Sequence, residues 1–556
     1  MHKPSTHPAL ILSLSLLSAC SQPIPTPDAS APDAMDDAAR ADDGPDIVDV
    51  TRADASLDAL PDGAQDAAID AQPDGPMDST LDSQPDSQPD VAVDSQPDSR
   101  PDVAVDSQPD SQPDAMPDAL PDAAPVATTF ARGFSGTGFE VVRRVAANAD
   151  GVYAVGDFSG TVDFGAGSVT TAGTGLFVVA LTHGGGVRWT LASTAAVSSA
   201  QNVAFDSAGN VFVVGFYGGA GLSGWSTAAS SSDAFVASYS RDGALRWMWR
   251  IGGVGEERAT GVAIDAANSV YVSGSFAGSV DFGTGPVIPT GVDGFVARYT
   301  NLGSFASVAI ASGASDQRVN EVAIRNVGGV VQTDVAGEFE GSVTLGGRTT
   351  TSRGGVDAFV ARLRSDGTAQ WLRSFGSTGT DTAATIATSA SNVVAVGGSF
   401  SNSVDFGTGP SAARGTDGFV LWLDGDTSST TRVRTISGAG SAGDFALDLA
   451  ADGDATIVAG LCDGTTTLGA TMLACGTNGA AFVAGLDGAG DVQWTASNAA
   501  AGASAALGVA LSPMRGAMGR PLVVVGGRFS STLDLGSGSL TGRAPAPDGF
   551  VTVIAP

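Results

Sequence analysis

Acidic residues recur at a similar place along this chain, and they are the side chains whose type and spacing could do chemistry together. Each stands between the end of one repeated segment and the start of the next. The five are Glu140, Glu257, Asp316, Asp381 and Asp444. Converging carboxylates could bind Ca²⁺ through oxygen ligands, or a cationic or sugar ligand. The alternative interpretation is that each acid only caps its own turn, and the sequence has no Asp-x-Asp-x-Asp-Gly calcium loop.

Histidine offers little for catalysis. Of the three histidines, His2 and His7 lie in a predicted export signal, which leaves His183 in the turn Thr182-His183-Gly184-Gly185-Gly186. A Ser/His/Asp triad or a site with several histidine ligands would need partners that the sequence does not supply. We interpret His183 as a hairpin-turn residue.

The chain has three cysteines, and two of them fall close together in the sixth repeat. Cys462 and Cys475 lie on neighbouring predicted strands of an exported protein, which favours a disulfide between them. Two independent buried thiols are the alternative. A catalytic thiol would need a histidine or a cationic partner, and none is evident.

An array of seven repeats positions these residues. The pattern of Gly, any residue, an aromatic, six residues and Gly occurs seven times, with only Cys462 replacing the aromatic. The aromatic positions are 59 to 67 residues apart, at Phe158, Tyr217, Phe276, Phe339, Phe400, Cys462 and Phe529. A fixed spacing of this length indicates an array of supersecondary units.

Each repeat is predicted to contain four short strands. In the third repeat these are residues 261–265, 269–276 and 294–299, and a fourth strand that begins near Phe305. Alternating apolar residues bounded by Gly, Asp and Asn turns, with 75 glycines in the chain, indicate an all-β fold. Seven four-stranded units predict a seven-bladed β-propeller over residues 126–556.

The two ends of the array predict that the ring is closed. The last repeat stops after its third strand, at residues 548–553, and the chain ends at Pro556. The missing fourth strand has a counterpart at the other end, because residues 129–136 align with residues 248–253 of an internal repeat. An N-terminal strand that completes the last blade would remove an open sheet edge.

The repeats resemble the bacterial seven-bladed β-propeller repeat of the SBBP type. The resemblance rests on segments such as Val270-Tyr271-Val272-Ser273-Gly274-Ser275-Phe276, and it covers most of residues 129–553. It implies an extracytoplasmic propeller and no particular reaction. An Asp precedes the third strand in five repeats, where we expect it to cap the start of the strand through backbone amides. These residues are Asp233, Asp293, Asp357, Asp417 and Asp548.

Residues 1–20 are predicted to be a lipoprotein signal peptide. Lys3 precedes an apolar stretch at 9–17, which is too short to span a bilayer as a helix. The ending Leu17-Ser18-Ala19-Cys20 resembles the bacterial lipobox, in which the cysteine is acylated and becomes the mature N-terminus. Ser21 resembles the following residue of lipoproteins that are sent to an outer membrane.

Residues 21–125 are predicted to be a disordered tether. They hold 26 Asp, no Glu and three Arg, a net charge of −23 out of −32 for the whole chain. Repeated proline prevents a helix, and the like charges keep the segment extended. Nothing in the sequence would neutralise phosphates, so a nucleic-acid partner is not expected.

Together these features predict an outer-membrane lipoprotein, at the cell surface or facing the periplasm, that presents a propeller on a long tether. We expect a monomer that acts as a non-enzymatic binding or scaffold module for an envelope protein or a carbohydrate. The alternative is a hydrolase or lyase of envelope or extracellular polysaccharide, which would use two carboxylates at a set separation. A purely structural envelope component is a third hypothesis.

Overall fold

The computed structural model describes residues 129–194, 197–219, 229–283, 285–438, 440, 443–500, 502–516, 519–543 and 545–556. The predicted signal peptide, with Cys20, and the predicted tether lie outside these residues. The described residues form strands, turns and bends without any helix, so no helix that could cross a membrane occurs among them. The predicted all-β class is confirmed.

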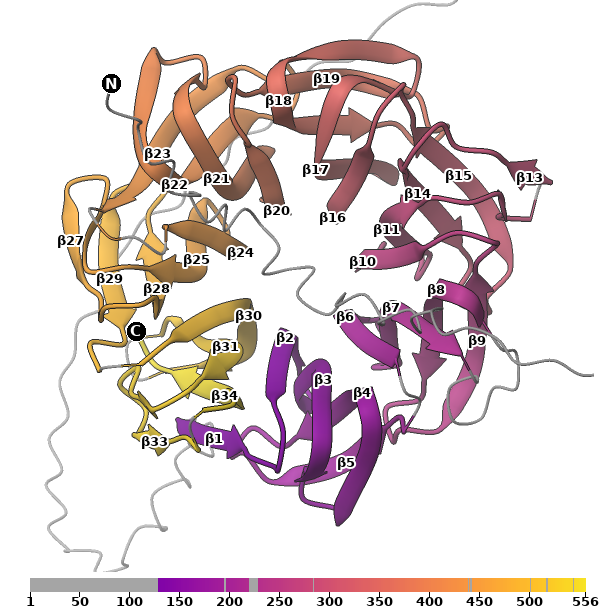
Figure 1. The fold of residues 1–556 in the computed structure, drawn as a ribbon. Coiled ribbons are helices and arrows are strands. Elements are labelled where there is room, and N and C mark those ends of the chain that lie inside the picture. The colour runs from indigo at the N-terminus through magenta and orange to yellow at the C-terminus, as the bar shows by residue number, and fades with distance from the viewer. Residues whose placement is uncertain are drawn as a thin grey trace, which may run out of the picture. The chain divides into compact units, whose positions relative to one another are not determined.

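The strands form a β-propeller, with the first strand of each repeat nearest the centre of a ring (Figure 1). Neighbouring first strands contact one another in chain order, and the last contacts the first. They are β2 (Glu140–Asn148), β6 (Val197–Phe205), β10 (Glu257–Ile264), β16 (Gln317–Val327), β20 (Thr382–Thr388), β24 (Phe445–Asp452) and β30 (Ser504–Arg515).

Antiparallel strands follow each inner strand outward. The first two groups add β3 (Gly151–Asp163), β4 (Ser168–Leu181) and β5 (Val187–Ala192), then β7 (Val211–Gly219), β8 (Ala229–Tyr239) and β9 (Leu245–Ile251). The third and fourth add β11 (Val270–Phe276), β14 (Asp293–Tyr299), β15 (Phe305–Ala311), β17 (Val330–Leu345), β18 (Arg348–Leu363) and β19 (Ala369–Phe375). The remaining groups add β21 (Val393–Asp405), β22 (Pro410–Asp424), β23 (Thr430–Gly438), β25 (Ala455–Cys462), β28 (Ala480–Leu486), β29 (Val492–Ser497), β31 (Pro521–Phe529) and β34 (Asp548–Ile554). Small hairpins comprise β12 (Val280–Asp281) with β13 (Pro286–Val287), β26 (Thr465–Leu468) with β27 (Thr471–Ala474), and β32 (Thr532–Leu533) with β33 (Leu540–Thr541).

The sequence predicted seven separate four-stranded sheets. Hydrogen bonding divides the described strands differently. Four sheets have four strands each, one has eight and one has six, beside two small two-stranded sheets. The eight-stranded sheet joins β2–β5 to β6–β9 through a single parallel bridge, Thr174 to Val197. A similar parallel bridge, Ser232 to Glu256, occurs between the next two groups without merging them. In the six-stranded sheet, β23 also pairs with β26 of the following group.

The N-terminal strand closes the ring as predicted. β1 (Phe130–Phe134) pairs antiparallel with β34, from Phe130 opposite Val553 to Phe134 opposite Gly549. The last sheet therefore has the order β1-β34-β31-β30, so that the first described strand lies beside the last one. This pairing leaves no unpaired edge on β34.

The recurring Gly-x-aromatic pattern has a steric cause. A Cβ added to Gly274 would lie 2.0 Å from the carbonyl oxygen of Arg258 on the inner strand, so only glycine fits there. Two residues later, Phe276 is fully buried and its ring lies 5.5 Å from Phe282 and 6.3 Å from Phe295. These rings belong to a core that also includes Val214 and other side chains of the preceding sheet. The hydrophobic core thus lies between neighbouring sheets.

Tryptophans of the outer strands connect neighbouring sheets at the rim. The indole Nε1 of Trp189 donates to the carbonyl of Arg241 at 2.9 Å, and that of Trp247 donates to the carbonyl of Asn301 at 2.9 Å. Trp371 makes the equivalent bond to Gly425 at 2.7 Å. In each case the acceptor lies in the turn that precedes the outer strand of the next group of four strands. The rim therefore adds repeated polar contacts to the apolar core between sheets.

Candidate functional site

The five acids that the sequence singled out do not gather at one site. Glu140 and Glu257 begin β2 and β10, whereas Asp381 and Asp444 stand just before β20 and β24. These four side chains are buried, with at most 3% of their surface exposed. Among the described residues, no three His, Cys, Asp or Glu side chains are grouped so that they could hold a metal ion.

At least one oxygen of each buried acid accepts a hydrogen bond from a backbone amide. Gly136 N–H donates to Glu140 Oε2 at 3.1 Å, and Gly253 N–H donates to Glu257 Oε2 at 3.0 Å. The amide of Ser377 donates to Asp381 Oδ2 at 2.7 Å, and the amide of Asp463 donates to Asp444 Oδ1 at 3.1 Å. Glu140, Glu257 and Asp381 each cap their own connection, which was the alternative interpretation of the sequence pattern. The donor to Asp444 lies instead in the loop after β25.

Asp316 is one residue away from the position that matches the other acids. Glu140 stands opposite Phe158 and Glu257 opposite Phe276, and in the fourth repeat Gln317 stands opposite the matching Phe339. Asp316 itself keeps 44% of its side chain exposed and pairs with Arg318 at 2.9 Å. The sequence comparison found an acid close to the position, but an amide occupies it.

Burial raises the pKa of several of these groups. It raises the pKa of Glu140 to about 8, of Glu257 to about 7 and of Asp444 to about 6. The pKa of Asp381 is raised by burial as well. Removal from water disfavours the charged form of a carboxyl group, and the backbone donors offset this only in part.

The histidine and the two cysteines occupy structural positions. His183 Nε2 lies 3.2 Å from the carbonyl oxygen of Ala149 in an exposed contact. Cys462 and Cys475 are joined by a disulfide with a Cα–Cα distance of 5.9 Å, and Cys462 is fully buried. The disulfide spans the small hairpin β26–β27, at the position where the other repeats have an aromatic side chain.

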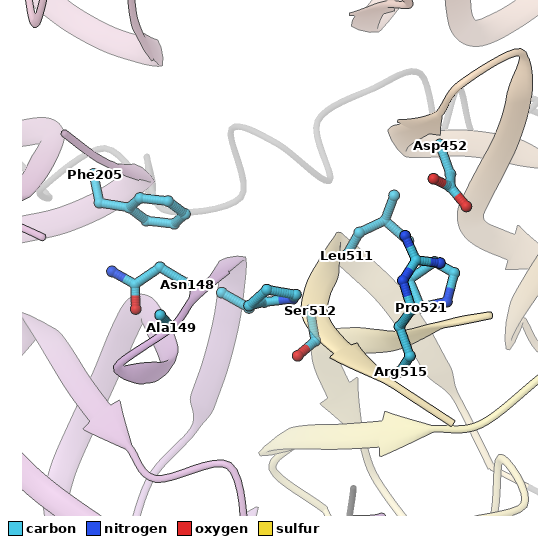
Figure 2. Close-up of a pocket in the computed structure, with 10 residues that line it drawn as sticks. Asn148, Ala149, Phe205, Asp452, Leu511, Ser512, Arg515 and Pro521 are labelled. Carbon is cyan, nitrogen blue, oxygen red and sulfur yellow. The ribbon is translucent and has the colours of Figure 1, made fainter. Parts of the chain in front are cut away.

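A hollow of about 420 Å³ opens where inner strands of four repeats end. Figure 2 shows Phe205 and Asn148 on one side of it, and Asp452 and Arg515 on the other. The complete lining is Ala147, Asn148, Ala149, Phe205, Asp452, Leu511, Ser512, Pro513, Arg515 and Pro521. An aromatic ring with an amide, a carboxylate and a guanidinium suits a polar ligand that also has an apolar face.

Local backbone irregularities direct a second set of side chains to the ring axis. Every inner strand has a β-bulge at its middle, where one extra residue interrupts the pairing. A bulge re-aims the side chains beside it. The residues that follow the bulge are Arg144, Asn202, Gly261, Glu321, Thr385, Asp448 and Gly508.

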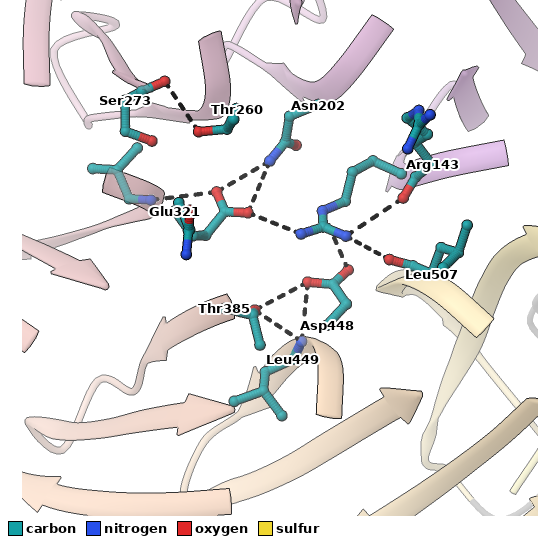
Figure 3. Close-up of polar contacts among 12 residues, drawn as sticks. Arg143, Asn202, Thr260, Ser273, Glu321, Thr385, Asp448, Leu449 and Leu507 are labelled. Atoms are coloured by element: carbon teal, nitrogen blue, oxygen red, sulfur yellow. Dashed lines mark hydrogen bonds and ion pairs between the residues drawn. The ribbon is translucent and has the colours of Figure 1, made fainter. Parts of the chain in front are cut away.

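Five of these residues form one hydrogen-bonded group, which we call the axial cluster: Arg144, Asn202, Glu321, Thr385 and Asp448. Figure 3 labels Asn202, Glu321, Thr385 and Asp448 of this cluster. Arg144 Nη2 donates to Glu321 Oε2 at 3.3 Å, and its Nε lies 3.9 Å from Asp448 Oδ2. Asn202 Nδ2 lies 3.0 Å from both oxygens of Glu321, and Thr385 Oγ1 donates to Asp448 at 3.2 Å. One cation from β2 thus joins two carboxylates from β16 and β24.

The two glycines of this set leave room for the cluster. A Cβ on Gly261 would lie 2.7 Å from Glu321 Oε1, and one on Gly508 would lie 2.8 Å from the Cα of Arg144. Both distances are shorter than real Cβ contacts, so larger residues would displace the cluster or the strands. The five side chains therefore occupy the space that the other two inner strands leave free.

Burial sets the proton affinity of the axial cluster. It raises the pKa of Glu321 to about 7, with the charge of Arg144 opposing the rise. The pKa of Asp448 is raised by burial as well, again against the charge of Arg144. The neighbouring carboxylates raise the pKa of Arg144 overall despite its burial, so the cation is retained.

Comparisons with known proteins show no family for this chain. No family model and no curated protein sequence matches this chain. A Dos1 propeller structure is similar over 76% of this chain and 95% of its own, with 10% identity and a TM-score of 0.39. The polysaccharide lyase Uly1 is similar over 79% of this chain and 94% of its own, with 8% identity and a TM-score of 0.37. A subtype N10 neuraminidase-like protein of A/little yellow-shouldered bat/Guatemala/060/2010 is similar over 76% of this chain and 99% of its own, with 8% identity and a TM-score of 0.32.

Neither the hollow nor the axial cluster was predicted from the sequence. Arg144, Glu321 and Asp448 stand at matching places in the first strands of three repeats, each directly before an apolar residue. That coincidence was a usable signal, because a charge on a buried strand needs a partner. The hollow left no such signal, since its lining comes from strand ends and turns in distant parts of the chain.

Proposed function

We propose that this protein is a lipid-anchored, extracytoplasmic propeller that binds a carbohydrate of the cell envelope at the hollow and does not cleave it. The hollow carries the proposal, because it is a described cavity of ligand size with convergent side chains from four repeats. Phe205 offers an aromatic surface for a sugar ring, and Asn148, Asp452 and Arg515 offer hydrogen bonds to hydroxyl groups.

The hydrogen bonding of the carboxylates supports binding rather than turnover. A glycosidase needs two carboxyl groups that flank the bond to be cleaved. Glu321 and Asp448 are held by Arg144 and by the amides of their neighbours, and the buried acids of the connections are held by backbone amides. Asp452 is the one carboxylate in the lining of the hollow.

The seven inner strands support a count of seven blades, with the eight-stranded sheet comprising two of them. Acylation of Cys20 would anchor the chain in the outer membrane, and residues 21–125 would hold the ring away from the lipid surface. We propose that the ring is monomeric. The resemblance to the SBBP repeat and the lipobox-like sequence support this arrangement.

Retention on polysaccharide tests the function. The purified protein is incubated with capsular polysaccharide and, separately, with insoluble peptidoglycan, and the bound fraction is measured against concentration. We expect saturable binding to one of them, and about tenfold weaker binding for Phe205→Ala and for Arg515→Ala. Arg364→Ala, an exposed arginine in the turn before β19, is the control and should bind normally. Binding that is equal in all four proteins, or undetectable in the parent protein, would refute the hollow as the site.

A further inference from the structure

The same backbone hydrogen bond recurs where neighbouring sheets meet. The amide of Glu140 donates to the carbonyl of Pro547 at 2.9 Å, and the amides of Asp381 and Asp444 donate to Val356 and Thr416 at 2.8 and 3.1 Å. In each case the next residue after the acceptor is an Asp of the third strand of the preceding sheet. Asp548 begins β34 as the sequence predicted, but Asp357 and Asp417 lie inside β18 and β22, because these strands start earlier than predicted. The parallel bridge from Ser232 to Glu256 places Glu257 beside Asp233 in the same way.

Four sheet interfaces therefore contain two carboxyl groups from two different sheets. We call these the interface carboxyl pairs: Glu140 with Asp548, Glu257 with Asp233, Asp381 with Asp357, and Asp444 with Asp417. All eight residues are buried, with at most 3% of their surface exposed. The sequence predicted separate capping roles for the two sets of acids and did not predict that they meet.

Each pair has an oxygen that lacks a hydrogen-bond donor among the described residues. These buried oxygens are Glu140 Oε1, Glu257 Oε1, Asp233 Oδ1, Asp357 Oδ1 and Asp417 Oδ2. A buried acceptor without a donor destabilises the folded state, and it does so more strongly when it is charged. A proton on one carboxyl group of a pair would supply the missing donor and remove the repulsion between two buried charges.

Cations compensate for the pairs only in part. Within the described residues, one of the eight acids forms an ion pair, Asp233 with Arg250, so the proton of that pair belongs on Glu257. Tyr217 also faces Asp233, without a positive charge. Of the other charged groups that face the pairs, Arg543 lies near Glu140, Arg353 near Asp357, Arg414 near Asp417, and Asp463 near Asp444.

We propose that each of these four interfaces is held together by one proton shared between its two carboxyl groups, so that the ring is most stable in mildly acidic surroundings and loosens in alkaline surroundings. The device is built into the interfaces between sheets and does not depend on the ligand of the hollow.

The direction of the pH effect follows from linkage. Burial raises the pKa of Glu140 from 4.5 to about 8 and that of Glu257 from 4.5 to about 7. It raises the pKa of Asp357 and of Asp444 from 3.8 to about 6. The folded state then holds protons that the unfolded state has released, so stability falls as pH rises through these values. For each such group, the folding equilibrium constant falls about tenfold per pH unit between the two pKa values.

Denaturant unfolding of the full chain at about pH 5, 6, 7, 8 and 9 tests the proposal. We expect the folding constant to fall steadily from pH 5 to pH 8. In Glu140→Gln and in Glu257→Gln, the folding constant should fall about tenfold less per pH unit than in the parent protein. In the double variant it should fall about a hundredfold less per pH unit, because two pairs are removed. The chain already has an amide, Gln317, at the matching position of another interface. A constant that is flat or rises over this range in the parent protein would overturn the proposal.

Two further measurements guard against other sources of the pH effect. Glu256→Gln removes an acid adjacent to Glu257 whose side chain is 62% exposed, and this control should leave the pH dependence unchanged. Glu321 titrates in the same range, with a pKa raised to about 7, whereas the pKa values of Asp357 and Asp444 in the two remaining pairs are raised only to about 6. A slope between about pH 6 and 8 that survives undiminished in the double variant would therefore assign the effect to the axial cluster and overturn the proposal. If a variant fails to fold, the infrared band of neutral carboxyl groups in the folded parent protein decides. We expect the band to be present at about pH 6 and to be lost by about pH 9. Absence of the band at about pH 6 would refute the shared protons.

Discussion

At the scale of single residues, one arginine supplies the positive charge that the buried carboxylates at the centre of the ring need. Arg144 is the cation of the axial cluster, and Glu321 and Asp448 reach it from strands that are far from β2 in the sequence. Their side chains keep only 9–11% of their surface exposed. Buried charges of this kind are stable only while they remain paired.

Replacing Arg144 with methionine should therefore be severely destabilising. The Arg144→Met variant leaves two buried carboxylates without a cation, and we expect a loss of about 3–5 kcal/mol in the free energy of unfolding. Urea unfolding at neutral pH measures it. Arg434→Met, which removes a pair with Asp491 whose side chains are 30% and 68% exposed, should change stability by about 1 kcal/mol or less. Similar losses in the two variants would contradict a structural role for the axial cluster.

Residue-level prediction from sequence succeeded for glycines and failed for acids. Gly274 and its counterparts are fixed by contacts within one sheet, so a repeat alignment finds them. Whether an acid faces water, an amide or another acid depends on the neighbouring sheet. An alignment therefore placed Asp316 in a set to which Gln317 belongs, and it could not pair Glu257 with Asp233.

At the scale of strands, the disulfide replaces a ring contact that the other repeats have. Cys462 is buried in a hydrophobic cluster with Leu468 and Leu473 of the hairpin β26–β27. A covalent link across 13 residues restricts the unfolded chain.

The Cys475→Ser variant tests the contribution of this link. We expect the free energy of unfolding to fall by about 3 kcal/mol, as for other loops of about this length. A reducing agent should lower the stability of the parent protein to that of the variant and leave the variant unchanged. Stability that does not respond to either change would show that the hairpin is held by its apolar contacts alone.

The closing strand β1 should be needed for an ordered last sheet. Deletion of residues 129–135 exposes the edge of β34, so amides of β34 should exchange with solvent much faster than those of β11, an interior strand of another sheet. Hydrogen exchange followed by mass spectrometry measures this. Deletion of seven tether residues, 86–92, is the matched control and should leave exchange in β34 unchanged. Slow exchange in β34 after loss of β1 would contradict closure by this strand.

Strand-level prediction was accurate because each strand carries its own pattern. The predicted strand at 269–276 is β11 at Val270–Phe276, and the predicted fourth strand near Phe305 is β15. Bulges in the inner strands and the bridge from Thr174 to Val197 could not be predicted, since they arise only when strands meet around the ring.

At the scale of the whole molecule, the proposed anchor and tether would decide which ligands the ring can reach. A Cys20→Ser variant should be exported but no longer acylated, and we expect it in the soluble fraction rather than in membranes. Cell fractionation and labelling with a fatty-acid analogue measure this, with Cys475→Ser as the control that stays membrane-bound. A Cys20→Ser protein that still sediments with membranes would exclude the lipid anchor.

One incubation tests most directly whether the ring binds without catalysis. The purified protein is mixed with the polysaccharide that retains it, and both the bound protein and the chain length of the polymer are followed over time. We predict saturable retention while the polymer keeps its length, with retention reduced in Phe205→Ala. Progressive shortening of the polymer, abolished by a single substitution such as Asp452→Asn, would contradict the proposal and identify the hollow as a catalytic site.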